Sequence, residues 1–236
     1  STAAFASVSW TDADKWRGFF DFGTGAFGDM ACHTMNLPFR GLKLGAVEKA
    51  ECIQIEGKNK DSYPSKSIVK MSYAPRKGMP AVNLFWYDGN LKPSADLMPQ
   101  VIASLGEVPK TGCLIIGDKG MMVSTNDYGQ EAYVALKGEE KMKATTKHEA
   151  LLNIPQAIER CCKGGQYIEF VNACKGEGKA YSDVGVSVPM LEGMLVGTIA
   201  QQIPGKLTWN SARQMFVGND AANALTRPYI RKGWEF

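Results

Sequence analysis

The sequence predicts an α+β fold, in which helices pack on one face of a mostly antiparallel open β-sheet. Two observations predict it. Apolar residues recur with helical spacing near both ends of the chain, and the middle consists of short segments rich in β-branched and aromatic residues, separated by turn residues. The 236 residues contain no internal repeat or low-complexity linker. We therefore expect residues 1–236 to form a single domain.

A helix is predicted over residues 25–44. Its apolar side chains recur every three or four residues, which places them on one face. Pro38 lacks a backbone N–H and is expected to bend the helix or to end it early, and Gly45 is expected to stop it. The apolar positions are Phe27, Met30, Ala31, Met35, Phe39 and Leu42.

Strands are predicted in the middle of the chain. Segment 90–108 has no clear period and is interpreted as a loop with a short helical turn. A hairpin is expected around the turn 117–120. The predicted strands are 47–56, 67–74, 81–87, 112–116, 121–124 and 131–136.

Helices are predicted again after a charged stretch that ends at His148, a histidine that we expect to be solvated. Glycine-rich breaks separate them. The predicted helices are 154–163, 166–174 and 188–203, followed by a strand or turn at 206–210 and a short helical piece at 221–225.

The predicted sheet leaves one face without helices. An antiparallel sheet can expose such a face to water, but the aromatic residues within 84–87 favour a protein partner. We expect a homodimer or tetramer formed through this sheet face.

Composition narrows the classes of partner. The net charge is +3, from 27 basic and 24 acidic side chains that are interspersed, so no nucleic-acid-binding stripe is indicated. The most apolar segment, 186–203, is interrupted by Glu192 and by glycines, which is typical of a core helix and not of a membrane span. We therefore expect neither a nucleic-acid nor a membrane partner.

The six cysteines form no C-x-x-C pair and have no histidine at metal-ligand spacing, so no metal site is predicted. Apolar surroundings such as those of Cys113 are typical of a small buried hydrophobic residue. Reduced thiols favour a cytoplasmic location. A periplasmic location would require a signal removed upstream, which would leave no trace in this chain.

The candidate site of chemistry is a pair of residues, Asp29 and His33, that follow a glycine-rich turn. Residues at this spacing face the same side of a helix, so the carboxylate can hold one imidazole nitrogen while the other faces a substrate hydroxyl. On spacing alone, the pair could also be a local ion pair that only stabilises the helix.

The same turn, residues 23–28, matches the dinucleotide-binding pattern G-x-G-x-x-G, and Glu48 lies 20 residues beyond its last glycine. Such a turn must follow a buried strand, whereas residues 10–22 carry five charged side chains. Asp29 would also repel a pyrophosphate. We therefore assign no cofactor-binding residue here and keep a nucleotide-binding turn as an alternative.

Several motifs are spread over nearly the whole chain. The most specific covers residues 21–33 and is preceded by Trp16 and Arg17. Together the motifs resemble the C-terminal half of the Gfo/Idh/MocA oxidoreductases. The other motifs are 86–89, 116–120, 209–210 and 229–234.

The resemblance implies an activity and roles for five residues. The family transfers hydride between NAD or NADP and a hydroxyl-bearing carbon, commonly of a sugar or cyclitol. His33 would be the general acid or base, and Asp29 would orient it and raise its basicity. Arg17 and Trp16 would contact the substrate. Asn36 stands where many members carry an aspartate, and its amide could bind a sugar hydroxyl but could not take a proton.

The resemblance also implies a second domain. In the family, an N-terminal Rossmann domain binds NAD or NADP, and no such domain occurs in this chain. We therefore expect the cofactor to be bound mainly by a missing domain and the chain alone to be inactive. The alternative is a non-catalytic sugar-binding or assembly module that retained the fold.

Overall fold

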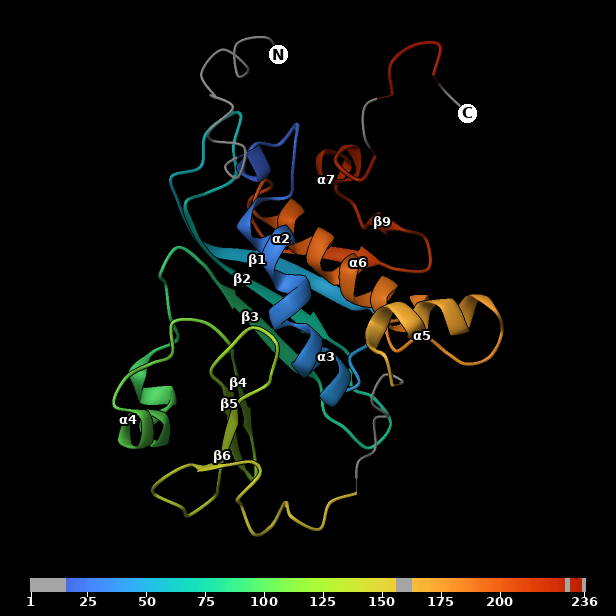
Figure 1. Ribbon diagram of the computed structural model, residues 1–236. Coiled ribbons are helices and arrows are strands. Elements are labelled where there is room, and N and C mark those ends of the chain that lie inside the picture. Colours follow the sequence, from blue (N-terminus) through green and yellow to red (C-terminus); the bar gives the residue numbers. More distant parts are fainter. Residues whose placement is uncertain (1–15, 156–162, 228–229, 235–236) are drawn as a thin grey trace. The chain divides into compact units, whose positions relative to one another are not determined.

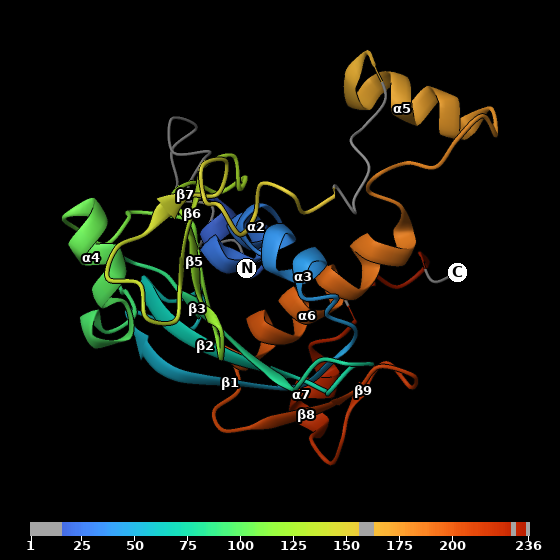
Figure 2. The same cartoon turned by 90° about the horizontal axis from the view of Figure 1, so that it is seen from below.

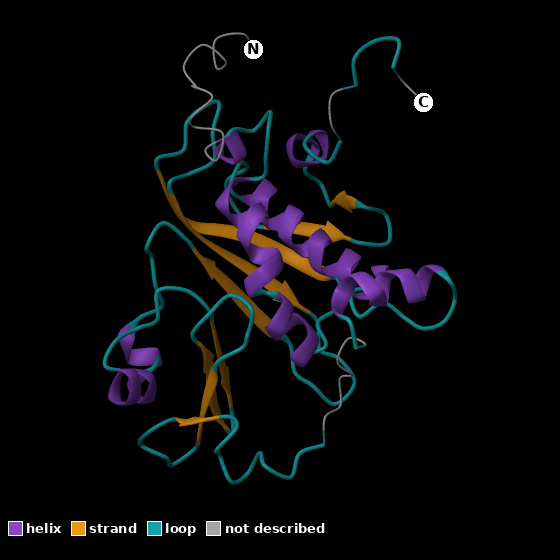
Figure 3. Cartoon of the chain, in the orientation of Figure 1, coloured by secondary structure: helices purple, strands orange, loops and turns teal. Residues whose placement is uncertain are grey.

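The computed structural model describes residues 16–155, 163–227 and 230–234, and it confirms the α+β class (Figures 1 and 3). Its contacts group the chain into two compact units, residues 1–97 with 190–236 and residues 98–189. Each unit has its own sheet and its own cluster of buried apolar residues. Two such units can still form one cooperative domain. The prediction of a single domain therefore stays a prediction.

The first unit contains a five-stranded antiparallel sheet of order β3-β2-β1-β8-β9. Along β2, buried side chains alternate with half-buried ones, as expected when helices cover one face of a strand. The three predicted strands of this unit are confirmed, and the predicted strand or turn at 206–210 is a strand. A further short strand, β9, was not predicted. The strands are β1 (Val47–Glu56), β2 (Lys66–Tyr73), β3 (Val82–Tyr87), β8 (Leu207–Asn210) and β9 (Met215–Phe216).

Helices cover one face of this sheet (Figure 2). They are α2 (Gly25–Thr34), α3 (Asn36–Gly41) and the portion of α6 (Val184–Ala200) that belongs to this unit. Phe27 of α2 is fully buried, and its ring stacks on Trp86 of β3 with centroids 5.0 Å apart. This contact fixes the helix that carries the candidate site against the sheet.

The predicted first helix is divided at Met35 and not at Pro38. Pro38 cannot donate to the carbonyl of Thr34, so the regular hydrogen-bond ladder loses one bond just there. Met35 still donates to Ala31 (2.8 Å) and accepts from Phe39 (2.8 Å), which keeps the two helices in sequence. Pro38 therefore interrupts the helix one turn before its own position, at the carbonyl of Thr34.

The opposite face of β1, β2 and β3, which no described helix of this unit covers, carries both aromatic and charged side chains. Leu84 and Trp86 pack against the core, whereas Phe85 between them lies on the other face and is 42% exposed. Lys70 of β2 lies over the Phe85 ring, with its Nζ 5.7 Å from the centroid. Burial raises the pKa of Tyr87 on the same face.

The second unit is built around an antiparallel sheet of order β4-β5-β6-β7. The predicted hairpin is confirmed, with β4 and β5 paired from Cys113–Ser124 to Gly117–Gly120. Met98 and Val101 belong to the buried cluster on this sheet. The elements here are α4 (Pro99–Leu105), β4 (Cys113–Gly117), β5 (Gly120–Ser124), β6 (Ala132–Leu136), β7 (Lys143–Ala144) and α5 (Gly165–Cys174).

The prediction that His148 is solvated is wrong. Its side chain is 2% exposed, its Nε2 donates to Glu139 Oε2 (3.0 Å), and its Nδ1 accepts from the Ala150 N–H (3.2 Å). The hydrogen bond that Glu139 accepts from His148 is the main reason that the pKa of Glu139 lies below its usual range. The histidine therefore ties the turn after β6 to the chain after β7.

Three further predictions concern a loop and the helices of the C-terminal half. Segment 90–108, expected to be a loop with one helical turn, contains both η2 (Ala95–Leu97) and α4. Helices are found at α5 and at α7 (Asp220–Ala224), close to the predicted 166–174 and 221–225. The predicted helix 154–163 falls largely on residues 156–162, which lie outside the described residues.

Candidate active site

The five predicted site residues lie on α2, on α3 and in the turn that precedes them. Asp29 and His33 are one helical turn apart on α2, so their side chains leave the same side of the helix. Asp29 is exposed and His33 is half-buried. A half-buried imidazole on an exposed helix side can serve as a proton acceptor or donor for a bound hydroxyl.

Arg17 forms an ion pair with Asp29, from Nη1 to Oδ2. The two side chains are 48% and 47% exposed, so water screens the pair and its net contribution to stability is small. The guanidinium nevertheless fixes where the carboxylate lies. The sequence motif implied a substrate contact for Arg17, and nothing in the sequence indicates the pairing of Arg17 with Asp29.

Gly23 explains how Arg17 reaches Asp29. A β-carbon at Gly23 would lie 2.6 Å from both Cα and the carbonyl oxygen of Arg17, closer than real side chains approach. The Gly23 N–H donates to the carbonyl of Phe19 (3.0 Å), which closes the turn. Only glycine lets the chain fold back against Arg17 before α2 begins.

The space beside the other two glycines of the turn is also filled by the protein itself. Gly25 has a φ of +70°, and a β-carbon there would lie 2.7 Å from the Tyr63 ring. A β-carbon at Gly28 would collide with the Thr24 side chain. All three glycines of the G-x-G-x-x-G pattern therefore serve close packing within the chain.

Trp16 and Asn36 take part in local contacts. The Trp16 ring lies 5.7 Å from the Phe22 ring, measured between centroids. Asn36 Oδ1 accepts from Arg40 Nε (2.9 Å) within α3. What Asn36 could offer a substrate is thus its amide N–H groups, which is compatible with binding a hydroxyl oxygen.

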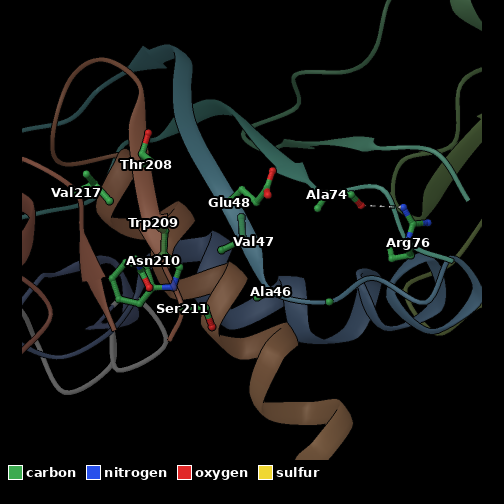
Figure 4. A pocket seen from close by; sticks show the side chains of 11 residues that line it. Ala46, Val47, Glu48, Ala74, Arg76, Thr208, Trp209, Asn210, Ser211 and Val217 are labelled. Atoms are coloured by element: carbon green, nitrogen blue, oxygen red, sulfur yellow. Dashed lines mark hydrogen bonds between the residues drawn. The ribbon is translucent and has the colours of Figure 1, made fainter. Parts of the chain in front are cut away.

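A groove of about 490 Å³ lies at one end of the same sheet (Figure 4). The ladder between β1 and β8 consists of the pairs Lys49–Thr208 and Ala50–Leu207, and the groove begins where the strands separate beyond it. None of the five predicted site residues lines it. Its polar lining comes from Glu48, Arg76, Thr208, Asn210 and Ser211.

Two charged side chains of the groove differ in their contacts. Glu48 follows Val47 at a register irregularity between β1 and β2, and its carboxylate points into the open space (Figure 4). Arg76 braces the loops beside the groove, because it donates to the carbonyls of Leu42 (2.6 and 3.1 Å), Ala74 and Pro80. Its donors are therefore already used. No sequence signal could have joined residues 48 and 208, which are distant along the chain.

Neither a set of known protein-family models nor the curated proteins contain a match to this sequence. Within the described residues, no three side chains that could ligate a metal ion gather at one place. No helix of the described part has both the length and the apolar character needed to cross a bilayer.

Proposed function

We propose that the chain is the substrate-binding domain of an NAD(P)-dependent oxidoreductase of the Gfo/Idh/MocA type, which oxidises a CH–OH group of a sugar or cyclitol. The observation that carries the proposal is the placement of Asp29 and His33 one turn apart on α2, both reachable from solvent, with Arg17 on the carboxylate. The sequence motifs around this helix support the same class.

In this proposal His33 takes the hydroxyl proton while the carbon–hydrogen bond breaks and the carbonyl forms. The nicotinamide, when bound, accepts the hydride. Asp29 stabilises the imidazolium that results, because a carboxylate favours the charged form of a neighbouring imidazole. Asn36 would donate a hydrogen bond to a second hydroxyl of the substrate.

The nicotinamide site would belong mainly to a Rossmann domain that joins this chain. The turn at residues 23–28 fits that division, because its glycines are taken up by Arg17, Tyr63 and Thr24 and leave no cradle for a phosphate. In residues 16–22, the described part of the chain that precedes the turn, there is a short 3₁₀ turn and an isolated bridge at Phe19 but no strand. A dinucleotide turn requires that strand.

The partner in this proposal is a second copy of the chain, bound through the helix-free face of β1, β2 and β3. That face combines the apolar ring of Phe85 with lysines and with Glu51, which lies opposite Lys70. Interspersed charges of both signs on one face allow a two-fold pairing in which each acidic group meets a basic one.

The second candidate function is a non-catalytic sugar-binding or assembly module. The groove at Glu48 favours it, because the groove lies apart from Asp29 and His33. The reading frame that contains this chain separates the two functions. A Rossmann domain encoded directly upstream, and sugar-dependent reduction of NAD(P) by the joined protein, support the oxidoreductase. The absence of an encoded Rossmann domain supports the non-catalytic module.

Titration of the isolated chain with NADH tests the remaining alternative, a nucleotide-binding turn. The proposed division predicts no saturable enhancement of nicotinamide fluorescence. Saturable enhancement that is lost on Gly23→Ala would place the nucleotide on this chain and contradict that division.

A further inference from the structure

The groove beside Glu48 lies where the sheet of the first unit loses a strand pair. β1 and β8 pair at Ala50–Leu207 and at Lys49–Thr208, and beyond these pairs the two strands separate. Residues 45–48 and 208–211 line its two sides, and its volume is about 490 Å³ (Figure 4). Binding sites for small molecules commonly have volumes of about 300–1,000 Å³. The groove is therefore large enough for a ligand of the size of a single sugar ring.

Both walls of the groove are held by contacts within the protein. On one side, the Arg76 guanidinium donates to the carbonyl of Leu42 (2.6 and 3.1 Å). On the other side, Trp209 Nε1 donates to the Glu192 carboxylate of α6, and the indole packs edge-on against Phe216 with centroids 4.8 Å apart. The groove is thus formed before any ligand binds, so binding does not have to order its walls.

A β-bulge turns the Glu48 side chain into the groove. Val47 pairs with Tyr73 and Lys49 with Ser72, so Glu48 is the extra residue of β1, and a bulge redirects a side chain. The carboxylate points into the open space (Figure 4). No hydrogen bond or ion pair engages it within the described part of the chain. Such a carboxylate can accept hydrogen bonds from two neighbouring hydroxyl groups.

Three further side chains of the groove have hydrogen-bonding groups to offer. The hydroxyl groups of Thr208 and Ser211 have no partner among the residues that the structure describes. Asn210 Oδ1 accepts from the Arg213 N–H (3.0 Å), so its amide N–H groups are what it can offer a ligand. The groove thus combines a carboxylate acceptor, two hydroxyl groups that donate and accept, and an amide donor. This set matches a ligand that carries several hydroxyl groups.

The charges of the groove favour a neutral ligand. Its lining carries one carboxylate, that of Glu48, and one guanidinium, that of Arg76, so the two charges cancel. The N–H groups of Arg76 already point to backbone carbonyls, so an anion would meet Glu48 without gaining a strong donor. A polycation would meet Arg76, and also Lys49, which follows Glu48 on β1.

We propose that this groove binds a neutral polyhydroxylated small molecule, a monosaccharide or a cyclitol. Glu48 accepts from two adjacent hydroxyl groups of the ligand, and Asn210 donates to a third. The site goes beyond the proposed oxidoreductase, because none of the five residues assigned to its chemistry lines the groove. To the second candidate function it gives a ligand class and the residues that bind it.

Nuclear magnetic resonance of the ¹⁵N-labelled chain tests the proposal. Titration with myo-inositol or D-glucose should shift the amide signals of residues 45–48 and 208–211 until they saturate. Spermidine and inorganic phosphate are the charged probes, and neither should cause saturable shifts of these signals. Saturable shifts with a charged probe but with neither polyol would overturn the proposal. It is also overturned if none of the four probes shifts these signals.

Variants identify the groups that bind. Glu48→Gln should weaken polyol binding by about tenfold, because a neutral amide replaces the charged acceptor. Ala46→Phe, at an exposed position of the groove, should fill the space and abolish binding. The matched control is Glu56→Gln at the other end of β1, where Lys66 already pairs with the carboxylate, and it should not change binding. Equal affinity of Glu48→Gln and Glu56→Gln would contradict the role of Glu48.

The same spectra separate the groove from the proposed active site. A polyol bound beside His33 should shift the amide signals of α2, and those shifts should persist in Glu48→Gln. Shifts of α2 alone would overturn the groove as a binding site and leave the proposed oxidoreductase standing. The oxidoreductase fails if His33→Ala keeps full turnover in the complete protein, whatever the result at Glu48.

Discussion

Gly197 of α6 lies directly against the ring of Phe27 on α2, so that a β-carbon at position 197 would overlap the ring. The contact brings the two helices together above the sheet, and Phe27 in turn stacks on Trp86. Because Phe27 precedes Asp29 by two residues, the packing of α6 determines where the candidate site lies.

Gly197→Ala should therefore destabilise the protein. We expect a loss of about 1–3 kcal/mol in the free energy of unfolding, since the Phe27 ring cannot move away without leaving its stack. Urea denaturation measures it. Gly41→Ala is the matched control, because a β-carbon there meets open space and φ is not positive. Equal effects of the two substitutions would contradict the account.

The Glu139–His148 contact should make stability depend on pH. The pKa of Glu139 in the folded chain lies below its ordinary value of 4.5, chiefly because His148 donates a hydrogen bond to it. The folded state therefore binds a proton less readily than the unfolded chain, and the contact contributes stability above the ordinary carboxyl pKa. That contribution is lost as the pH falls through the folded-state value.

Glu139→Gln is the variant that tests this dependence. It should be less stable than the natural chain at neutral pH, and the difference should shrink as the pH is lowered from about 5 to about 3. Chemical denaturation at several pH values measures the difference, and Glu140→Gln at the exposed neighbouring position is the control. A difference that grows on acidification would show that the contact has the opposite sign.

The helix-free sheet face should mediate association. Phe85→Glu places a charge at the most exposed ring of that face, so it should convert a dimer or tetramer into monomers, measured by sedimentation equilibrium. A stable interface buries about 800 Å² on each copy, which a three-stranded face can supply. Tyr128→Glu, at an exposed position of the other unit, should leave association unchanged. A natural chain that is monomeric at all concentrations would refute the proposed interface.

The two compact units should unfold together. Among the described residues of the second unit, the buried cluster consists of Met98, Val101, Val123, Ala135 and Met142, a small core for a separate domain. All five tryptophans fall in the other unit, so tryptophan fluorescence reports on one unit and far-ultraviolet circular dichroism on both. Coincident urea transitions are expected from a single domain. Two separated transitions would mean two domains.

The sequence reveals most of the sheet because strand signals are local. In β2, apolar side chains at alternate positions face the core, and the turn at residues 117–120 identifies the hairpin without knowledge of any distant residue. The start of α6 is harder to predict from the sequence. The predicted helix 188–203 is found as α6, but α6 begins at Val184, ends at Ala200 and contains Pro189.

Contacts between distant residues explain the other differences. The burial of His148 depends on Glu139 and on the Ala150 N–H, and a charged neighbourhood in the sequence gives no sign of them. At the candidate site, helical spacing predicted that Asp29 and His33 share a side of α2. It could not predict that a turn fixed by Asp61 and Tyr63 would bring Arg17 onto Asp29.

The turnover of His33→Ala in the complete protein tests the central claim most directly. With the proposed Rossmann domain joined to it, the chain should reduce NAD(P) in the presence of a sugar or cyclitol. His33→Ala should lower kcat by about a hundredfold or more, because the alcohol loses its proton acceptor, while the affinity for NAD(P) stays nearly the same. Undiminished turnover in that variant would contradict the account.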